Sequence, residues 1–239
     1  MDAPLLQIKQ VSKHFGGFTA LSGVSLDIAR GERFGLIGPN GSGKTTLINC
    51  ISGSLRNESG SIRFENSEIS GLAAYQRTRR GIARSFQIPR PFHSMSVLEN
   101  LLVPSAYVAH LREAEAEAKA MEILSSIGLA GKAGVLASQL SQVELRKLEL
   151  ARAMAAKPRL LISDEAMAGL AGAEVDEVLK ILFDLNEKGI TIIMIEHIMQ
   201  AVMRFSQRVV CLDAGKIICE GTPTQIVGNP EVQKAYLGA

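Results

Sequence analysis

A glycine-rich stretch between an apolar run and a helical one restricts most strongly what this 239-residue chain can fold into. Residues 38–46 read G-P-N-G-S-G-K-T-T and fit the pattern G-x-x-x-x-G-K-[ST] without a gap. The apolar run of residues 33–37 predicts a buried strand before it, and residues 45–51 predict the first turns of a helix after it. Backbone N–H groups in such a turn, together with the helix N-terminus, favour a bound phosphate. The stretch therefore predicts a phosphate-binding loop, and its flanking elements argue against a chance match.

The residue types in this loop suit a nucleoside triphosphate with its metal ion. We expect the Lys44 ammonium to reach the β- and γ-phosphates and the Thr45 hydroxyl to bind Mg²⁺. The candidate nucleotide-binding residues of the loop are Gly38, Pro39, Asn40, Gly41, Ser42, Gly43, Lys44, Thr45 and Thr46.

Composition and charge restrict the class of protein. Apolar residues make up 46% of the chain and charged residues 21%, as in a globular domain with a sizeable core. The net charge of +2 gives no basic field for nucleic acid, and no apolar run approaches the ~20 residues that cross a bilayer. The start at Met1–Pro4 lacks the pattern of a signal peptide, and three cysteines show neither close pairing nor metal spacing. We expect a soluble, intracellular protein without a transmembrane segment.

The hydrophobic pattern changes from α/β to helical and back again. Serine followed three residues later by glutamate, at Ser96 and again at Ser141, is typical of a helix start. The Ala- and Glu-rich residues 111–127 end at Gly128. The pattern predicts one domain over residues 1–239, with a core of about 1–87 and 158–239 and an inserted helical subdomain of about 88–157.

Two features of the first third of the chain have more than one interpretation. Residues 5–30 predict two antiparallel strands joined through Gly16-Gly17, and Phe15 beside that turn fits either the core or a stacking contact with a base. Residues 72–84 hold four arginines, and without interleaved aromatics we expect a solvated helix face rather than a nucleic-acid patch.

Titratable residues follow two further predicted strands. Asp164 and Glu165 come after the apolar residues 159–163, and His197 follows the apolar residues 190–195. Because ligands of parallel sheets bind beyond the carboxyl ends of the strands, one sheet can bring these side chains to the glycine loop. Asp164 then suits Mg²⁺, Glu165 suits activation of the attacking water, and His197 suits the γ-phosphate. Structural alternatives are an exposed acidic turn and a strand-end histidine, and a kinase would place an acceptor hydroxyl here instead.

Together these motifs resemble the ATP-binding subunit of an ABC transporter over nearly the whole chain. The resemblance implies a P-loop NTPase core of the α/β class with an antiparallel β subdomain, and ATP and Mg²⁺ as cofactors. It implies that residues 38–46 are the Walker A motif and that Gln87 contacts both the nucleotide and the metal. It also implies that Glu165 is the catalytic acid residue, and that Phe15 stacks on adenine. In the same resemblance Asp164 ends the Walker B motif, His197 is the switch histidine, and Ser141 belongs to the signature that contacts a nucleotide.

The run G-I-A-R-S-F-Q at residues 81–87, M-I-E-H at 194–197 and A-Y-L-G at 235–238 are similar to the importers of branched-chain and other hydrophobic amino acids. That branch implies a peripheral subunit at the cytoplasmic face of the inner membrane, where it contacts integral permease subunits. It further implies a second ATP-binding subunit in a head-to-tail dimer and, indirectly, a periplasmic solute-binding protein. Two alternatives are a soluble ABC ATPase of DNA repair or translation and a regulatory nucleotide-binding subunit with weak hydrolysis.

The sequence departs from the family pattern at several positions. In the signature L-S-G-G-Q, Gln142 and Val143 replace the two glycines and Glu144 replaces the glutamine, so that side chains and a negative charge stand where a nucleotide would be contacted. Ala166 and Ala171 replace the proline and the aspartate that often follow the catalytic acid. Because each signature would contact the partner's ATP, the changes suggest a different chain as partner, with this chain's own Walker site active and the opposite site weaker.

Overall fold

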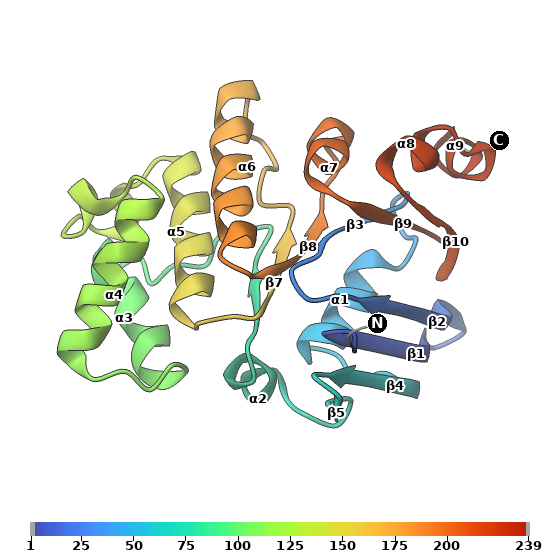
Figure 1. Ribbon diagram of the computed structural model, residues 1–239, viewed down its shortest axis with the longest axis horizontal. Coiled ribbons are helices and arrows are strands. Elements are labelled where there is room, and N and C mark those ends of the chain that lie inside the picture. The colour runs from blue at the N-terminus through green and yellow to red at the C-terminus, as the bar shows by residue number, and fades with distance from the viewer. Residues whose placement is uncertain (1–2, 238–239) are drawn as a thin grey trace.

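A six-stranded, mostly parallel sheet forms the centre of the computed structural model, which describes residues 3–237 (Figure 1). Met1 and Asp2 at the start, and Gly238 of the C-terminal A-Y-L-G run, lie outside the described residues. The strand order is β10-β9-β3-β8-β7-β6, with every neighbouring pair parallel except β9 and β10. The strands are β3 (Arg33–Ile37), β6 (Ile82–Ser85), β7 (Leu160–Asp164), β8 (Thr191–Ile195), β9 (Arg208–Asp213) and β10 (Lys216–Gly221).

The central sheet is buried on both faces, which explains why its strands read as continuous apolar runs. Side chains of β8 alternate between two hydrophobic clusters: Ile192 and Met194 belong to one, and Ile193 and Ile195 to the other. The first cluster packs against helices, which are α3 (Val97–Tyr107), α4 (Glu113–Ser126), α5 (Gln142–Ala155), α6 (Gly172–Glu187), α7 (Met199–Phe205), α8 (Pro223–Val227) and α9 (Pro230–Leu237).

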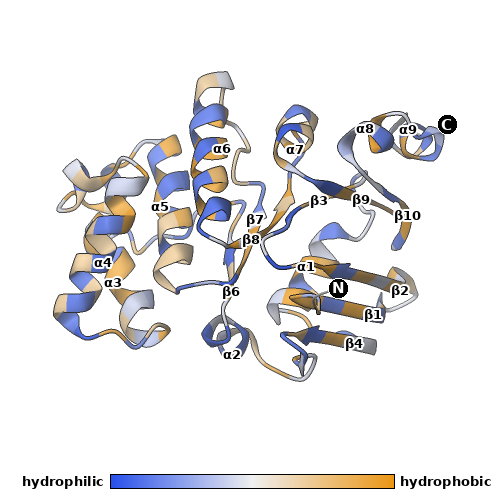
Figure 2. Cartoon of the chain, in the orientation of Figure 1, coloured by the Kyte–Doolittle hydropathy of each residue, from blue (hydrophilic) through white to orange (hydrophobic). Residues whose placement is uncertain are grey.

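The second cluster packs the central sheet against helix α1 (Lys44–Ser52) and a four-stranded antiparallel sheet. That sheet has the order β2-β1-β4-β5, and its strands are β1 (Leu6–Phe15), β2 (Phe18–Ile28), β4 (Ser59–Phe64) and β5 (Ser67–Glu68). Along its strands, buried apolar residues alternate with more exposed polar ones, and the alternation is visible along β1 and β2 (Figure 2). The predicted α/β class with an antiparallel β part is confirmed.

Helices α3, α4 and α5 contact one another at the end of the molecule opposite β10 (Figure 1). They lie inside the stretch for which we predicted helices, although the division into a core and a helical subdomain stays a prediction. No helix within residues 3–237 has the length and the apolar character that crossing a membrane would need.

The expectation that the arginines of residues 72–84 form a solvated helix face is wrong for two of them. Arg77 on the short helix α2 (Ala74–Arg79) is 1% exposed, and its guanidinium donates to the carbonyls of Cys50 and Ile51 at 2.5 and 2.9 Å. It thereby satisfies carbonyl groups at the end of α1 that lack intrahelical partners. Arg84 lies in strand β6 rather than on a helix.

Candidate functional site

The glycine-rich loop connects the end of β3 to the start of α1, and backbone of β2 and β9 and the side chain of Tyr236 lie against it. A Cβ atom on Gly38 (φ 148°) would lie 2.1 Å from the carbonyl oxygen of Leu212, and one on Gly43 (φ 107°) would lie 2.5 Å from that of Ala20. Only glycine fits at both positions, because of this close approach and the positive φ. The Gly38 N–H also donates to the Tyr236 hydroxyl at 2.9 Å, which joins the last helix to the loop.

The loop holds polar groups that suit a phosphate. The Lys44 ammonium lies 2.7 and 2.9 Å from the carbonyl oxygens of Gly38 and Pro39, and its burial lowers the pKa of Lys44 while the charge of Glu165 opposes that shift. The Ser42 hydroxyl is buried without a hydrogen-bond partner among residues 3–237. A buried cation that contacts carbonyl oxygens, beside a hydroxyl without a partner in the described residues, fits an anionic ligand. The adjoining cavity of about 230 Å³ is lined by Phe15, Phe18, Ala20, Asn40–Thr46, Glu165 and His197.

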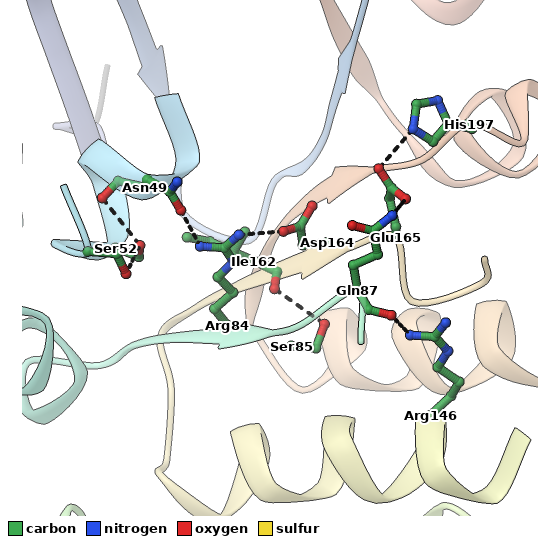
Figure 3. A network of polar contacts seen from close by, with 11 residues as sticks. Asn49, Ser52, Arg84, Ser85, Gln87, Arg146, Ile162, Asp164, Glu165 and His197 are labelled. Carbon is green, nitrogen blue, oxygen red and sulfur yellow. Dashed lines mark hydrogen bonds and ion pairs between the residues drawn. The ribbon is translucent and has the colours of Figure 1, made fainter. Parts of the chain in front are cut away.

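Glu165 occupies the centre of a network of side chains beside this cavity (Figure 3). Its Oε1 lies 2.8 Å from Nε2 of His197, and Gln87 donates its amide N–H to the other carboxylate oxygen. Glu165 also has a φ of 49°, an uncommon value for a non-glycine residue that is often found at functional sites. Strands β7 and β8 are neighbours, which explains how residues 165 and 197 meet. The carboxylate is therefore a candidate general base oriented by two neighbours.

A second hollow, of about 180 Å³, brings together the residues that we predicted as metal ligands. Thr45, Gln87 and Asp164 line it together with Glu165. They offer only hydroxyl, amide and carboxylate oxygens, and no group of three or more acidic, histidine or cysteine side chains suited to a metal occurs in the described part of the chain. This sparse oxygen set fits Mg²⁺, which takes few protein ligands and several from phosphates and water. When bound there, Mg²⁺ would neutralise charge on the phosphate oxygens.

Two arginines that sequence reasoning missed contact residues of the site. Arg84 forms an ion pair with Asp164 at 2.5 Å. Arg146 of α5 donates to the carbonyl of Gln87 and, at 3.0 Å, to that of Ala168, so it connects α5 to the loops on either side of the site. The basic cluster in the sequence contains Arg84 but does not show its partner, and nothing in the sequence singles out Arg146.

Ser141 does not line the cavity of the glycine loop but stands at the N-terminus of α5. Its hydroxyl accepts a 3.4 Å hydrogen bond from the Glu144 N–H, and the Glu144 carboxylate accepts one of 3.0 Å in return, so the predicted helix start is confirmed. The Glu144 carboxylate also pairs with Lys132 at 2.5 Å, so a cation stands beside its negative charge, and the effect of that charge on a nucleotide stays a prediction. The pair and the cap lower the pKa of Glu144.

Phe15 is 50% exposed, so its interpretation as a core side chain is wrong. It lines the cavity of the glycine loop, with the Lys13 ammonium 5.5 Å from the ring centroid. An exposed ring beside a phosphate-binding loop is free to stack on a flat ligand group, and its contact with adenine stays a prediction.

Glu196 is a further buried acid that sequence reasoning missed. It is 3% exposed, and its Oε1 accepts a 2.9 Å hydrogen bond from the N–H of Met167, in the loop after Glu165. Burial, with the charge of Glu165 adding to it, raises the pKa of Glu196 to about 7. The carboxyl therefore links the strand that precedes His197 to the loop that follows the candidate base.

Replacing Glu196 with glutamine is expected to change how stability depends on pH. Because the pKa of Glu196 is raised from 4.5 to about 7 in the folded state, this carboxyl contributes stability that is complete below about pH 4.5 and is lost as the pH rises through about 7. Glutamine does not titrate and keeps an oxygen for the Met167 N–H. Urea unfolding at about pH 5 and about pH 8 should show that the wild type loses up to about 1.4 kcal/mol per pH unit relative to Glu196→Gln. Parallel pH profiles for the two proteins would contradict this account.

Comparison with known proteins places this geometry in a family. The sequence model described as ABC transporter matches residues 21–168, and that described as branched-chain amino acid ATP-binding cassette transporter matches residues 216–239. The high-affinity branched-chain amino acid transport ATP-binding protein BraF of Pseudomonas aeruginosa is 38% identical over 100% of this chain and 99% of its own.

Solved structures agree with the sequence comparison. The ADP conformation of an ATP-binding cassette of an ABC transporter superposes with a TM-score of 0.91 at 33% identity, and it covers 100% of both chains. A dimeric, post-hydrolysis cassette bound to ADP and phosphate superposes with a TM-score of 0.82 at 26% identity, over 91% of this chain and 98% of its own. The chain therefore belongs to the ATP-binding proteins of the ABC transporter family.

Proposed function

We propose that this protein binds and hydrolyses ATP with Mg²⁺ and so drives a membrane importer of branched-chain or other hydrophobic amino acids. The observation that carries the proposal is the single cavity that joins the glycine loop, with its buried Lys44, to Glu165 and His197. The end-to-end similarity to BraF, a branched-chain amino acid transport protein by name, supports the class of solute.

The side chains at the site suit distinct parts of the reaction. Lys44 holds the terminal phosphates once its ammonium leaves the carbonyls of Gly38 and Pro39. Glu165 accepts a proton from the attacking water, and His197 holds the carboxylate through the 2.8 Å contact between its Nε2 and Oε1 of Glu165. The hydrogen bond from the Gln87 amide to the Glu165 carboxylate gives the amide a way to sense whether the site is filled.

A groove beside the Gln87 loop offers a surface for the integral membrane subunits. It has a volume of about 310 Å³ between strand β6 and helices α3 and α5, and its wall is mostly apolar. Phe86, Phe92 and Tyr107 line it and are 39, 41 and 72% exposed. Exposed aromatic side chains gathered along a groove are typical of a protein interface. A permease segment bound here would lie directly beside the loop that contacts Glu165, and this chain would then be a peripheral subunit at the cytoplasmic face of the membrane.

The second ATP-binding subunit is proposed to be a different chain in a head-to-tail dimer. The dimeric cassette among the structural relatives supports pairing. The unusual residues 141–144 of this chain would contact the partner's ATP, while the partner's signature would complete the cavity described above. A periplasmic solute-binding protein would deliver the amino acid.

Transport into vesicles tests the proposal. The protein would be purified with its permease subunits and second ATP-binding subunit and reconstituted in liposomes, with the solute-binding protein and radiolabelled leucine on the opposite side. We expect uptake that requires Mg²⁺ and ATP and that stops when Lys44 is replaced by alanine. Glycine in place of leucine serves as the control solute. ATP hydrolysis without uptake of any hydrophobic amino acid would refute the proposed solute class, and absence of hydrolysis would refute the proposed activity.

A further inference from the structure

Arg84 lies between the two elements that carry the proposed Mg²⁺ ligands. Its Nη2 lies 2.5 Å from Oδ2 of Asp164 at the end of β7, and its Nη1 donates to Oδ1 of Asn49 on α1 at 2.7 Å (Figure 3). The Arg84 and Asp164 side chains are each 11% exposed. One guanidinium therefore connects the helix that follows the glycine loop to the strand that ends at the metal carboxylate.

Asn49 lies on the same helix as Thr45, which is one of the proposed Mg²⁺ ligands. Asn49 follows Thr45 by four residues on α1, so the two side chains lie on the same face of the helix, one turn apart. A contact that holds Asn49 therefore acts on the helix face that carries the Thr45 hydroxyl. On the other side, Arg84 uses only one carboxylate oxygen of Asp164, and within residues 3–237 no hydrogen bond occupies Oδ1. The second oxygen stays available to a metal or to its bound water.

We propose that Arg84 is a positioning residue that sets the spacing between Thr45 and Asp164, and so determines the affinity of the nucleotide site for its divalent metal ion. The proposal rests on the Mg²⁺–ATP site proposed above. Arginine suits this part because its planar fork presents separate N–H groups to two acceptors at once, whereas the single ammonium of lysine does not span them.

Stability alone does not account for the ion pair. Burying two opposite charges costs desolvation free energy, and their attraction offsets that cost only in favourable geometry. A buried ion pair is therefore weak evidence that the two residues serve only to stabilise the fold. The Nε atom of Arg84 is buried without a partner, which adds to that cost. Residues that hold metal ligands in place typically change metal affinity by about 10- to 100-fold when they are replaced.

Binding of Mn²⁺ to the full-length protein, measured by electron paramagnetic resonance with a non-hydrolysable ATP analogue present, tests the proposal. Arg84→Lys, Arg84→Gln and Asn49→Leu are expected to weaken Mn²⁺ binding by about 10- to 100-fold. Affinity for the same analogue in EDTA should stay close to that of the wild type, because Lys44 and the loop are untouched. Arg30→Gln, which removes an exposed ion pair with Glu65, is the matched control and should bind Mn²⁺ as the wild type does. Melting curves identify any variant that does not fold, and Asn49→Leu tests the same contact if the Arg84 variants fail.

Each other outcome overturns the inference. Unchanged Mn²⁺ binding in folded variants would give Arg84 a structural part only. Tighter binding would mean that the guanidinium competes with the metal for Asp164 instead of positioning it. If the wild-type protein binds the analogue but shows no Mn²⁺ binding at all, the proposed metal site fails and this inference fails with it.

Discussion

Replacing Glu165 with glutamine is expected to lower phosphate release by about 10²- to 10⁴-fold while ATP still binds. The amide has the size of the carboxyl but accepts no proton from water. Its oxygen and nitrogen can still contact His197 and Gln87, so the shape of the site is kept. Steady-state phosphate release and binding of a fluorescent ATP analogue measure the two effects separately. Glu117→Gln, on the exposed surface of α4, is the control and should match the wild type.

The same substitution tests the proposed asymmetry of the dimer. In the complex with the second ATP-binding subunit, Glu165→Gln should abolish most turnover, and replacement of the matching acid in the partner should leave a large share of it. This follows because residues 141–144 of this chain would contact only the partner's ATP. Loss of turnover from the partner's substitution, with turnover retained in Glu165→Gln, would contradict the proposal.

Replacing Lys44 with alanine is expected to weaken ATP binding by at least about 10²-fold and to abolish hydrolysis. Hydrogen bonds to a charged group contribute about 1.5–3 kcal/mol each, and the ammonium is placed to make at least two with the phosphates. Before the ammonium can contact the phosphates, its hydrogen bonds to the carbonyl oxygens of Gly38 and Pro39 have to break. Equilibrium binding of a fluorescent ATP analogue gives the affinity. Lys180→Ala on the exposed face of α6 is the control, and binding of normal strength by Lys44→Ala would show that the phosphates lie elsewhere.

Local patterns in the sequence were enough to predict the parts of the site that depend on neighbouring residues. The strand, glycine turn and helix around Gly38 are determined by residues that are neighbours in the sequence. Glu165 and His197 lie at the same edge of the sheet because each follows the carboxyl end of a parallel strand. The capping pairs of Ser96 and Ser141 are local in the same sense, and both occur in the structure.

The missed contacts are long-range and involve charged groups. Arg77, Arg84 and Arg146 find their partners across the fold, and a run of arginines in a sequence looks the same whether it is solvated or buried against carbonyls. Glu196 is similar, because adjacency to His197 says nothing about its contact with the Met167 N–H. The partners of such side chains depend on tertiary packing, and neither hydrophobic periodicity nor the spacing of motifs in the sequence predicts them.

A crystal structure of the protein with Mg²⁺ and a non-hydrolysable ATP analogue is the most direct test of the central claim, that residues 38–46 and their neighbours form an ATP site. We predict the triphosphate in the cavity lined by the glycine loop, Glu165 and His197, with the Lys44 ammonium moved from the Gly38 and Pro39 carbonyls to the phosphates. Nucleotide bound at another place, with Lys44 still on those carbonyls, would contradict the account.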